Sequence, residues 1–196
     1  MAEYFYQHPH DNVVAALAVV TDSANALRAV YYEFCDFTLS KHWKDRQGIL
    51  TDALTRRLLH DLLRGLAHMH HHGIIHRDIK PANLMLRIHP DSAMRLKIAD
   101  FGWNRAVVNV GDEIATPGAV TPVYRAPEIW LGKPYSFPVD VWSAGLVARE
   151  LLSGWRLYEL LDVISDGKAD QKLDLCRAAG GHIDGGDIPG TVYQVM

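Results

Sequence analysis

The chain has 196 residues, of which 48% are hydrophobic and 22% charged, as in an ordinary globular protein with one sizeable core. Its net charge of −3 argues against a general nucleic-acid-binding protein, which normally carries a basic excess. No apolar run approaches the ~20 residues that cross a bilayer, and a signal peptide is not evident. Cys35 and Cys176 are too few for a disulfide framework or a four-ligand zinc site. We therefore expect an intracellular protein, cytoplasmic or nuclear, with neither a membrane nor a nucleic-acid partner.

Two valine-rich runs near the start predict a β-hairpin. Residues 12–20 and 26–34 are rich in strand formers, and the five residues between them are turn formers. A long helix should follow with Thr51 as its N-cap, and Gly73 should come just after its C-terminal end. Its buried face is marked by apolar residues at steps of three or four: Leu54, Leu58, Leu62, Leu66 and Met69.

The remaining elements are a second hairpin and further helices. Residues 84–88 and 94–98 are apolar runs on either side of a His-Pro-Asp-Ser turn, which predicts a small hairpin. Residues 103–124 have no regular pattern, a buried helix is expected over 138–152, and another helix over 170–179. This order predicts an α+β fold in which a β-hairpin and a connecting segment precede a mainly helical body.

One stretch, His76-Arg77-Asp78-Ile79-Lys80-Pro81-Ala82-Asn83, brings an acid, a cation and an amide together. Asp78 can accept a proton, Lys80 can hold a phosphate, and Asn83 can offer an oxygen to a hard metal ion. Asp100-Phe101-Gly102 adds a metal-binding carboxylate beside a flexible glycine. Phosphoryl transfer needs these groups, because its catalysis consists mostly of positioning and charge neutralisation.

The order and spacing of these two motifs, with Ala126-Pro127-Glu128 after them, resemble the protein kinase family. The resemblance implies a partial protein-kinase fold that covers nearly the whole chain. Residues 1–34 would be a remnant of the small lobe, and residues 35–196 the hinge and an incomplete large lobe. It also implies transfer of phosphate from ATP to protein hydroxyls with the help of Mg2+. Seen singly, the two aspartates could be surface carboxylates in turns, and the joint match of three motifs disfavours that interpretation.

The resemblance implies a role for each residue of the reacting centre. Asp78 would orient the substrate hydroxyl and accept its proton, and Lys80 would steady the transferring phosphoryl group, with a preference for Ser/Thr acceptors. Thr121 would hydrogen-bond both of these side chains. Asn83 and Asp100 would coordinate Mg2+ at the nucleotide phosphates.

The resemblance also implies where ATP would bind. Tyr32 would be the gatekeeper at the back of the site. The backbone carbonyl of Glu33 and the backbone groups of Cys35 would face adenine. Met85 would form the floor of the purine site and Ala99 the wall before the metal-binding triplet, while Lys80 and Asp100 contact the phosphate end.

Regulation by phosphorylation is a further expectation. Arg77 directly precedes the catalytic aspartate, and its guanidinium can hold a phosphate through a forked pair of hydrogen bonds. Thr116 matches the position that carries the activating phosphate in cyclin-dependent kinases, and Arg105 matches a second arginine of the same pocket. We therefore expect phosphorylated Thr116 to pair with Arg77 and Arg105.

The subfamily is indicated by residues 124–145. Arg125 before the closing triplet is typical of cyclin-dependent, mitogen-activated and related kinases, in which it helps to accept a proline after the phosphoacceptor. The stretch 139–145 resembles the following helix, in which Asp140 would brace the backbone of the catalytic loop. A proline-directed Ser/Thr kinase with a possible cyclin-like activator is implied, although Pro122 and Val123 depart from the usual bulky residues.

Three alternatives remain open at this point, because two parts of a working kinase are missing. No glycine occurs before Gly48, so residues 1–47 hold no glycine-rich phosphate lid, and no strand lysine precedes the hairpin. The chain could be the catalytic half of a kinase seen as a fragment, a pseudokinase that acts as a protein-binding module, or a different fold that shares the motifs. The last of these is disfavoured by the joint match.

A run of histidines ends the predicted long helix. His68, His70, His71 and His72 could suggest a metal site, but no carboxylate or cysteine lies at a matching spacing. Protonated imidazoles at the negative end of a helix dipole are the simpler interpretation.

Overall fold

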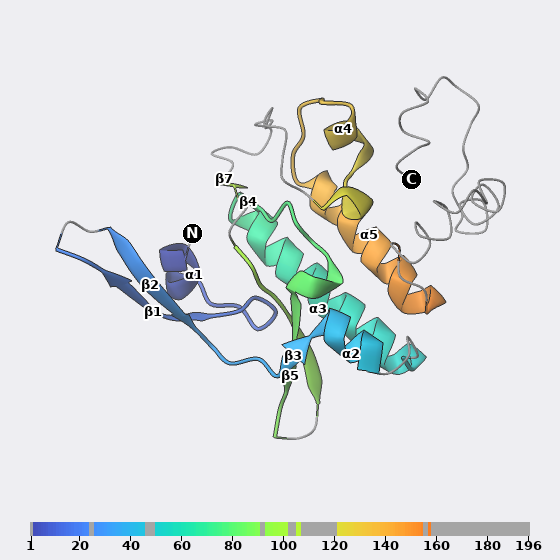
Figure 1. Ribbon diagram of the computed structural model, residues 1–196, viewed down its shortest axis with the longest axis horizontal. Coiled ribbons are helices and arrows are strands. Elements are labelled where there is room, and N and C mark those ends of the chain that lie inside the picture. Colours follow the sequence, from blue (N-terminus) through green and yellow to red (C-terminus); the bar gives the residue numbers. More distant parts are fainter. Residues whose placement is uncertain are drawn as a thin grey trace.

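The computed structural model describes residues 2–23, 26–45, 50–90, 93–101, 105–106, 121–154 and 157. Two long helices, α3 (Asp52–His71) and α5 (Pro138–Ser153), form the centre of the body, and a β-hairpin projects from one side of it (Figure 1). None of the helices in these ranges is long and apolar enough to cross a bilayer.

The first predicted hairpin is confirmed, with a later start. A short helix, α1 (Ala2–Gln7), precedes it, and β1 (Ala16–Thr21) pairs antiparallel with β2 (Leu27–Tyr32). The strand does not begin at residue 12, because the backbone there bonds elsewhere: Val14 N donates to Ile98 O at 2.9 Å, and Ile98 N donates to Asn12 O at 2.9 Å. Residues 12–14 therefore join the hairpin to the body.

The second predicted hairpin is confirmed with the predicted bounds, as β5 (Leu84–Ile88) and β6 (Met94–Ile98). The short strand β3 (Phe37–Thr38) adds to the β5 edge and leads directly into α2 (Leu39–Asp45). Another short pair joins β4 (Ile74–Ile75) to β7 (Arg105–Ala106). Sequence patterns did not predict β3, β4, β7 or α2, because two to seven residues are too few to establish a period.

The predicted long helix is confirmed as α3. The Thr51 hydroxyl accepts a hydrogen bond from Leu54 N at 3.3 Å, as an N-cap does, and Gly73 has a positive φ of 70° after the last turn. One face of the helix is buried against β6 and α5, and it carries Leu58, Leu62, Leu66 and Met69. This face supplies a large part of the core.

The predicted helix over 138–152 is α5, which ends at Gly154 in a left-handed conformation. Two short turns, η2 (Pro122–Tyr124) and α4 (Pro127–Trp130), precede it, and η1 (Pro81–Asn83) leads into β5. The helix expected over 170–179 lies outside the described residues. Figure 1 shows that η1 lies beside α3, while η2 and α4 approach the start of α5.

Candidate active site

The loop of residues 76–83 is anchored at its start by a buried carboxylate. Asp140, in the first turn of α5, is fully buried and accepts hydrogen bonds from His76 N and Arg77 N, both at 2.8 Å. Arg77 itself has a φ of 74°, a left-handed conformation that costs a non-glycine residue about 1–3 kcal/mol. The predicted bracing contact of Asp140 is thus present. A contact that was not predicted adds to it, because His70 Nε2 lies 2.9 Å from Asp140 Oδ2.

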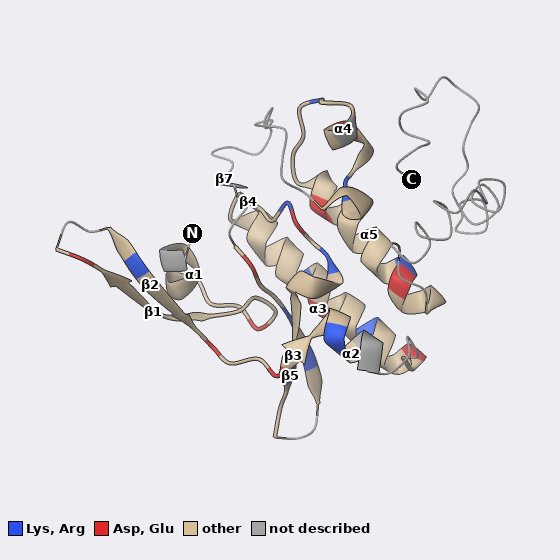
Figure 2. Ribbon diagram, viewed as in Figure 1, with Lys and Arg blue, Asp and Glu red and all other residues tan. Residues whose placement is uncertain are grey.

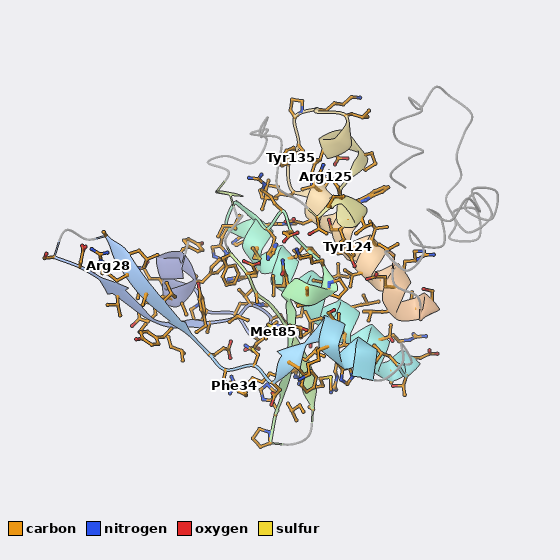
Figure 3. All side chains as sticks on the ribbon, in the orientation of Figure 1. Arg28, Phe34, Met85, Tyr124, Arg125 and Tyr135 are labelled. Carbon is orange, nitrogen blue, oxygen red and sulfur yellow. The ribbon has the colours of Figure 1, made fainter. Side chains whose placement is uncertain are left out.

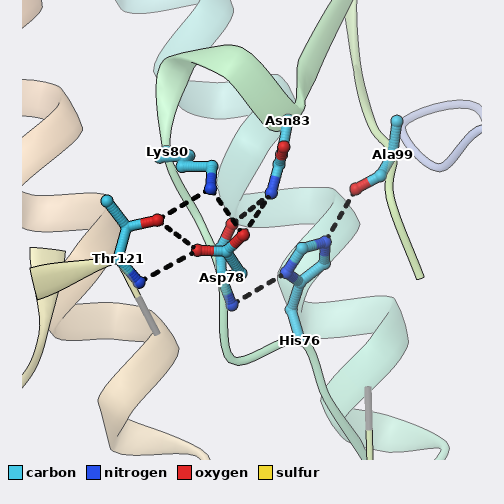
Figure 4. A network of polar contacts seen from close by, with 6 residues as sticks. All are labelled: His76, Asp78, Lys80, Asn83, Ala99 and Thr121. Atoms are coloured by element: carbon cyan, nitrogen blue, oxygen red, sulfur yellow. Dashed lines mark hydrogen bonds and ion pairs between the residues drawn. The ribbon is translucent and has the colours of Figure 1, made fainter. Parts of the chain in front are cut away.

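Asp78 is the centre of a hydrogen-bond network in which four predicted residues meet (Figure 4). Its Oδ1 accepts from the Thr121 hydroxyl at 2.8 Å and from Thr121 N at 3.3 Å. Its Oδ2 lies 2.7 Å from Lys80 Nζ and 2.8 Å from Asn83 Nδ2. Lys80 Nζ also donates to the Thr121 hydroxyl at 2.7 Å. With an exposed fraction of 4%, Asp78 is fixed in one orientation by these partners.

His76 connects this network to the segment that precedes the Asp-Phe-Gly triplet. Its Nδ1 accepts from Asp78 N at 3.2 Å, so its Nε2 carries the proton that is donated to Ala99 O at 2.8 Å. Ala99 N donates in turn to Asn83 O at 2.9 Å. The buried imidazole therefore fixes the distance between the two segments that carry Asp78 and Asp100.

Asn83 and Asp100 fit a site for Mg2+, which prefers oxygen ligands and takes one or two protein groups together with substrate phosphates. Asn83 Nδ2 donates to both the carboxylate and the backbone carbonyl of Asp78, whereas Asn83 Oδ1 has no partner among the described residues. Asp100 is exposed and has a φ of 62°. Burial, and then the negative charge of Asp100, raise the pKa of Tyr32.

The residues predicted to contact adenine lie at the end of β2, on the linker of residues 33–36 that joins β2 to β3, and on β5. The Tyr32 ring is 6.1 Å from that of Phe101. Met85 is half-buried on β5 between core residues, so its side chain lies on the face away from the core, and Figure 3 shows it beside the linker. The Glu33 carbonyl and the Cys35 backbone make no backbone hydrogen bond within the described ranges. Burial, and then the negative charge of Glu33, raise the pKa of the Cys35 thiol.

Of the three predicted regulatory residues, only Arg77 has a described side chain. It is 7% exposed, its guanidinium carbon is 5.8 Å from the centre of the Tyr135 ring, and its Nε has no hydrogen-bond partner in the described part of the chain. Arg105 lies on β7, but its side chain is outside the described set, as is all of Thr116. The phosphate pocket therefore stays a prediction.

The histidines at the end of α3 divide between two environments. His70 bonds to Asp140, whereas His68 stacks on His10 with ring centres 4.5 Å apart and lies 4.4 Å from His72. Burial lowers the pKa of both His10 and His68. In the described ranges, no group of three or more His, Cys, Asp or Glu side chains is arranged to hold a metal ion.

Sequence reasoning missed the polar contacts that join the 121–125 segment to α5. The Tyr124 hydroxyl donates to buried Glu150, 3.0 Å from its Oε2, and the Ser143 hydroxyl donates to Tyr124 O at 2.7 Å. Figure 3 shows Tyr124 above α5, with Arg125 and Tyr135 nearby. No local pattern indicates these contacts, because the partners are 19 and 26 residues apart. They fix the position of Thr121 over Asp78.

Comparison with known proteins gives the same family as the motifs. The family model described as "Protein kinase domain" matches residues 2–178. "Cell division control protein 2 homolog 3" of Trypanosoma brucei brucei is 35% identical over 176 residues, which is 89% of this chain and 53% of that protein. "Cyclin-dependent kinase 7" of Dictyostelium discoideum is 34% identical over 172 residues, 87% of this chain and 44% of that protein. The chain spans about half the length of these relatives, and it belongs to the protein kinase family.

Proposed function

We propose that this chain carries the catalytic half of an ATP-dependent Ser/Thr protein kinase of the cyclin-dependent type. The observation that supports it best is the Asp78 carboxylate, which has Thr121 on one oxygen and Lys80 with Asn83 on the other. A surface carboxylate in a turn, the alternative interpretation, does not account for a residue that is 4% exposed and bonded by three other side chains. Such a group is what a phosphoryl transfer site needs at the acceptor hydroxyl.

In this proposal, Asp78 orients the substrate hydroxyl and accepts its proton as the oxygen attacks the terminal phosphorus. Lys80, 2.7 Å from Asp78 Oδ2, can turn toward the transferring phosphoryl group and stabilise its charge. Thr121 keeps the two side chains in one geometry, since its hydroxyl donates to Asp78 and accepts from Lys80. Asp78 is buried and Lys80 and Thr121 are half-buried, so the carboxylate has little contact with bulk water.

Asn83 Oδ1 and the Asp100 carboxylate would hold Mg2+, which supplies charge neutralisation at the phosphates when it is bound. The Glu33 carbonyl and the Cys35 backbone would bond the adenine edge, with Met85 below the ring. Tyr32 and Ala99 would close the back and the wall of the site.

The substrates and partners follow from the relatives, and they are proposals for this chain. Two relatives carry cell-division and cyclin-dependent names, which supports a protein substrate and a cyclin-like activator. Arg125 before the closing triplet supports a preference for Ser or Thr followed by Pro. Phosphorylated Thr116, held by Arg77 and Arg105, would be the activating switch.

Phosphate transfer from ATP to a Ser-Pro peptide tests the proposal, with a Ser-Ala peptide for comparison. Asp78→Asn should abolish transfer, because the amide cannot accept the hydroxyl proton. Asp52→Asn, an exposed carboxylate in the first turn of α3, is the matched control and should leave transfer unchanged. Equal transfer by the parent and by Asp78→Asn would contradict the assigned role.

The alternative is a binding module without catalysis. Residues 1–47 hold no glycine, so no glycine-rich lid can form within them. For the same reason, we expect weak affinity of the chain for Mg·ATP. Magnesium-dependent ATP binding in the micromolar range would overturn that expectation. A chain that binds peptide but transfers no phosphate would support the binding module.

A further inference from the structure

A largely buried carboxylate joins the hairpin to the body at the point where the chain passes between them. Glu33 directly follows β2, and its Oε1 accepts from Ala15 N at 2.8 Å and from Lys97 Nζ at 2.7 Å. Its Oε2 lies 2.5 Å from Arg87 Nη1. Figure 2 shows acidic positions on the linker after β2 and basic positions on the neighbouring hairpin that contains β5. The Glu33 side chain, at the end of the hairpin, thus bonds the residue before β1 and one residue each of β5 and β6.

The group is charged and largely removed from water. The side chains of Glu33 and Lys97 are 10% and 9% exposed. Burial alone would raise the pKa of Glu33, but the hydrogen bonds from Lys97, from Ala15 N and from Arg87 outweigh it and hold the pKa below its ordinary value. A buried ion pair of this kind is costly to break from one side, because the remaining charge then has no partner.

The strand register places this group beside the proposed adenine site. Lys97 is the direct cross-strand partner of Met85, and Arg87 lies two residues beyond Met85 on the same strand. Residues two apart on a strand, and direct cross-strand partners, share one face of the sheet. The two cations that hold Glu33 therefore share a face with the residue that would lie under the purine.

The linker backbone is fixed at its start, where Glu33 N donates to Ala15 O at 2.9 Å. Phe34 is 77% exposed, so it does not anchor the segment in the core. The next fixed point is Asp36, whose N donates to Leu86 O at 3.0 Å. Between Glu33 and Asp36 the backbone groups that would face adenine are held only through these two end points.

We propose that Glu33, Lys97 and Arg87 form a hinge clamp that positions the backbone of Glu33 and Cys35 for adenine, so that Glu33 and Lys97 are positioning residues for nucleotide recognition. This inference rests on the proposed function, since it deepens the nucleotide site described above. The clamp acts by reducing the freedom of the linker before the nucleotide arrives, and such preorganisation strengthens binding without any new contact. Loss of the clamp should therefore weaken the binding of adenine and leave the binding of the phosphates unchanged.

Lys97→Met tests the clamp, because it removes the ammonium and keeps most of the stem. We expect the affinity for Mg·ATP, measured by calorimetry, to fall about tenfold. The affinity for magnesium tripolyphosphate, which lacks the base, should stay within about twofold. Lys97→Arg keeps the charge and should restore most of the ATP affinity. Arg28→Gln breaks an exposed ion pair with Asp22 in the same hairpin, and it should change neither affinity.

Equal losses for the two ligands, or no loss for either, would overturn the proposal. If Lys97→Met alone fails to fold, the double variant Glu33→Gln, Lys97→Met carries no buried unpaired charge at this pair, and it should show the same selective loss.

Hydrogen exchange of the Ala15 amide separates failure of the clamp from failure of the proposed function. This amide donates to Glu33 Oε1, so it should be protected in the free chain and should exchange about tenfold faster in Lys97→Met. If the parent chain binds no Mg·ATP, the proposed function fails, and hydrogen exchange of the Ala15 amide then decides by itself whether the clamp exists. A protected amide that Lys97→Met releases then supports it, and an unprotected amide overturns it.

Discussion

The contact between Asp140 and the 76–83 loop gives the sharpest stability prediction. Its carboxylate accepts two buried backbone N–H groups at 2.8 Å and lies 2.9 Å from His70 Nε2. Asp140→Ala leaves both N–H groups without an acceptor, at about 1–3 kcal/mol each. We expect the free energy of unfolding to fall by roughly 3–5 kcal/mol, out of the ~5–15 kcal/mol typical of a domain. Asp140→Asn offers one acceptor oxygen where two are needed, so it should lose about 2–3 kcal/mol.

Urea titration followed by circular dichroism measures these losses, with linear extrapolation of the free energy of unfolding to water. Asp52→Asn is the control, because this carboxylate is exposed in the first turn of α3 and should contribute at most ~1 kcal/mol through the helix dipole. Hydrogen exchange should also show faster exchange of the His76 and Arg77 amides in both Asp140 variants. A loss below ~1 kcal/mol for Asp140→Ala would refute the argument, since two unpaired buried donors cannot cost so little.

Two further predictions concern the glycines of α3 and α5 and a pair of stacked histidines, His10 and His68. An alanine Cβ at Gly65 would lie 2.6 Å from Asn12 O, whereas at Gly145 it would meet nothing within 4 Å. Gly65→Ala should therefore lower the free energy of unfolding by about 1–3 kcal/mol, and Gly145→Ala should raise it by up to ~1 kcal/mol; urea titrations that give both the same sign would contradict this. Burial lowers the pKa of His10 and His68 in the folded chain, so the unfolded chain binds more protons in acid. The free energy of unfolding should fall as the pH drops through the unfolded value of ~6.5 and level off below the folded pKa. Urea titrations at several pH values should show a smaller fall when both histidines are replaced by Gln.

The elements that sequence patterns predicted are those whose signal is local. The 3.6-residue period from Leu58 to Met69 marks α3 without reference to the rest of the chain. The β5–β6 hairpin needs only two apolar runs and a turn between them. By contrast, β3 is two residues long and exists because it finds the β5 edge, which lies more than 45 residues further along the chain. A pattern within a short window cannot predict such a pairing.

The site divides in the same way. Asp78, Lys80 and Asn83 were predicted because they are five residues apart at most, and the motif carries their chemistry. The side chains that support them were harder to predict. The bond between His70 and Asp140 joins residues 70 apart, and that between Glu33 and Lys97 joins residues 64 apart. A histidine in a run of four at a helix end, or a lysine on a strand, has no sequence feature that distinguishes a buried polar contact from an exposed position.

These two long-range contacts support different halves of the proposed reaction. Asp140, on α5, holds the backbone that precedes Asp78 and lies in contact with His70 of α3. Glu33 fixes the linker on which adenine would bind, through β5 and β6. Because the two sets share no side chain, their effects should add when both are changed. The acceptor side of the site then depends on α5 and on the bonds of the 76–83 loop to Ala99, whereas the nucleotide side depends on how the hairpin is held against the body.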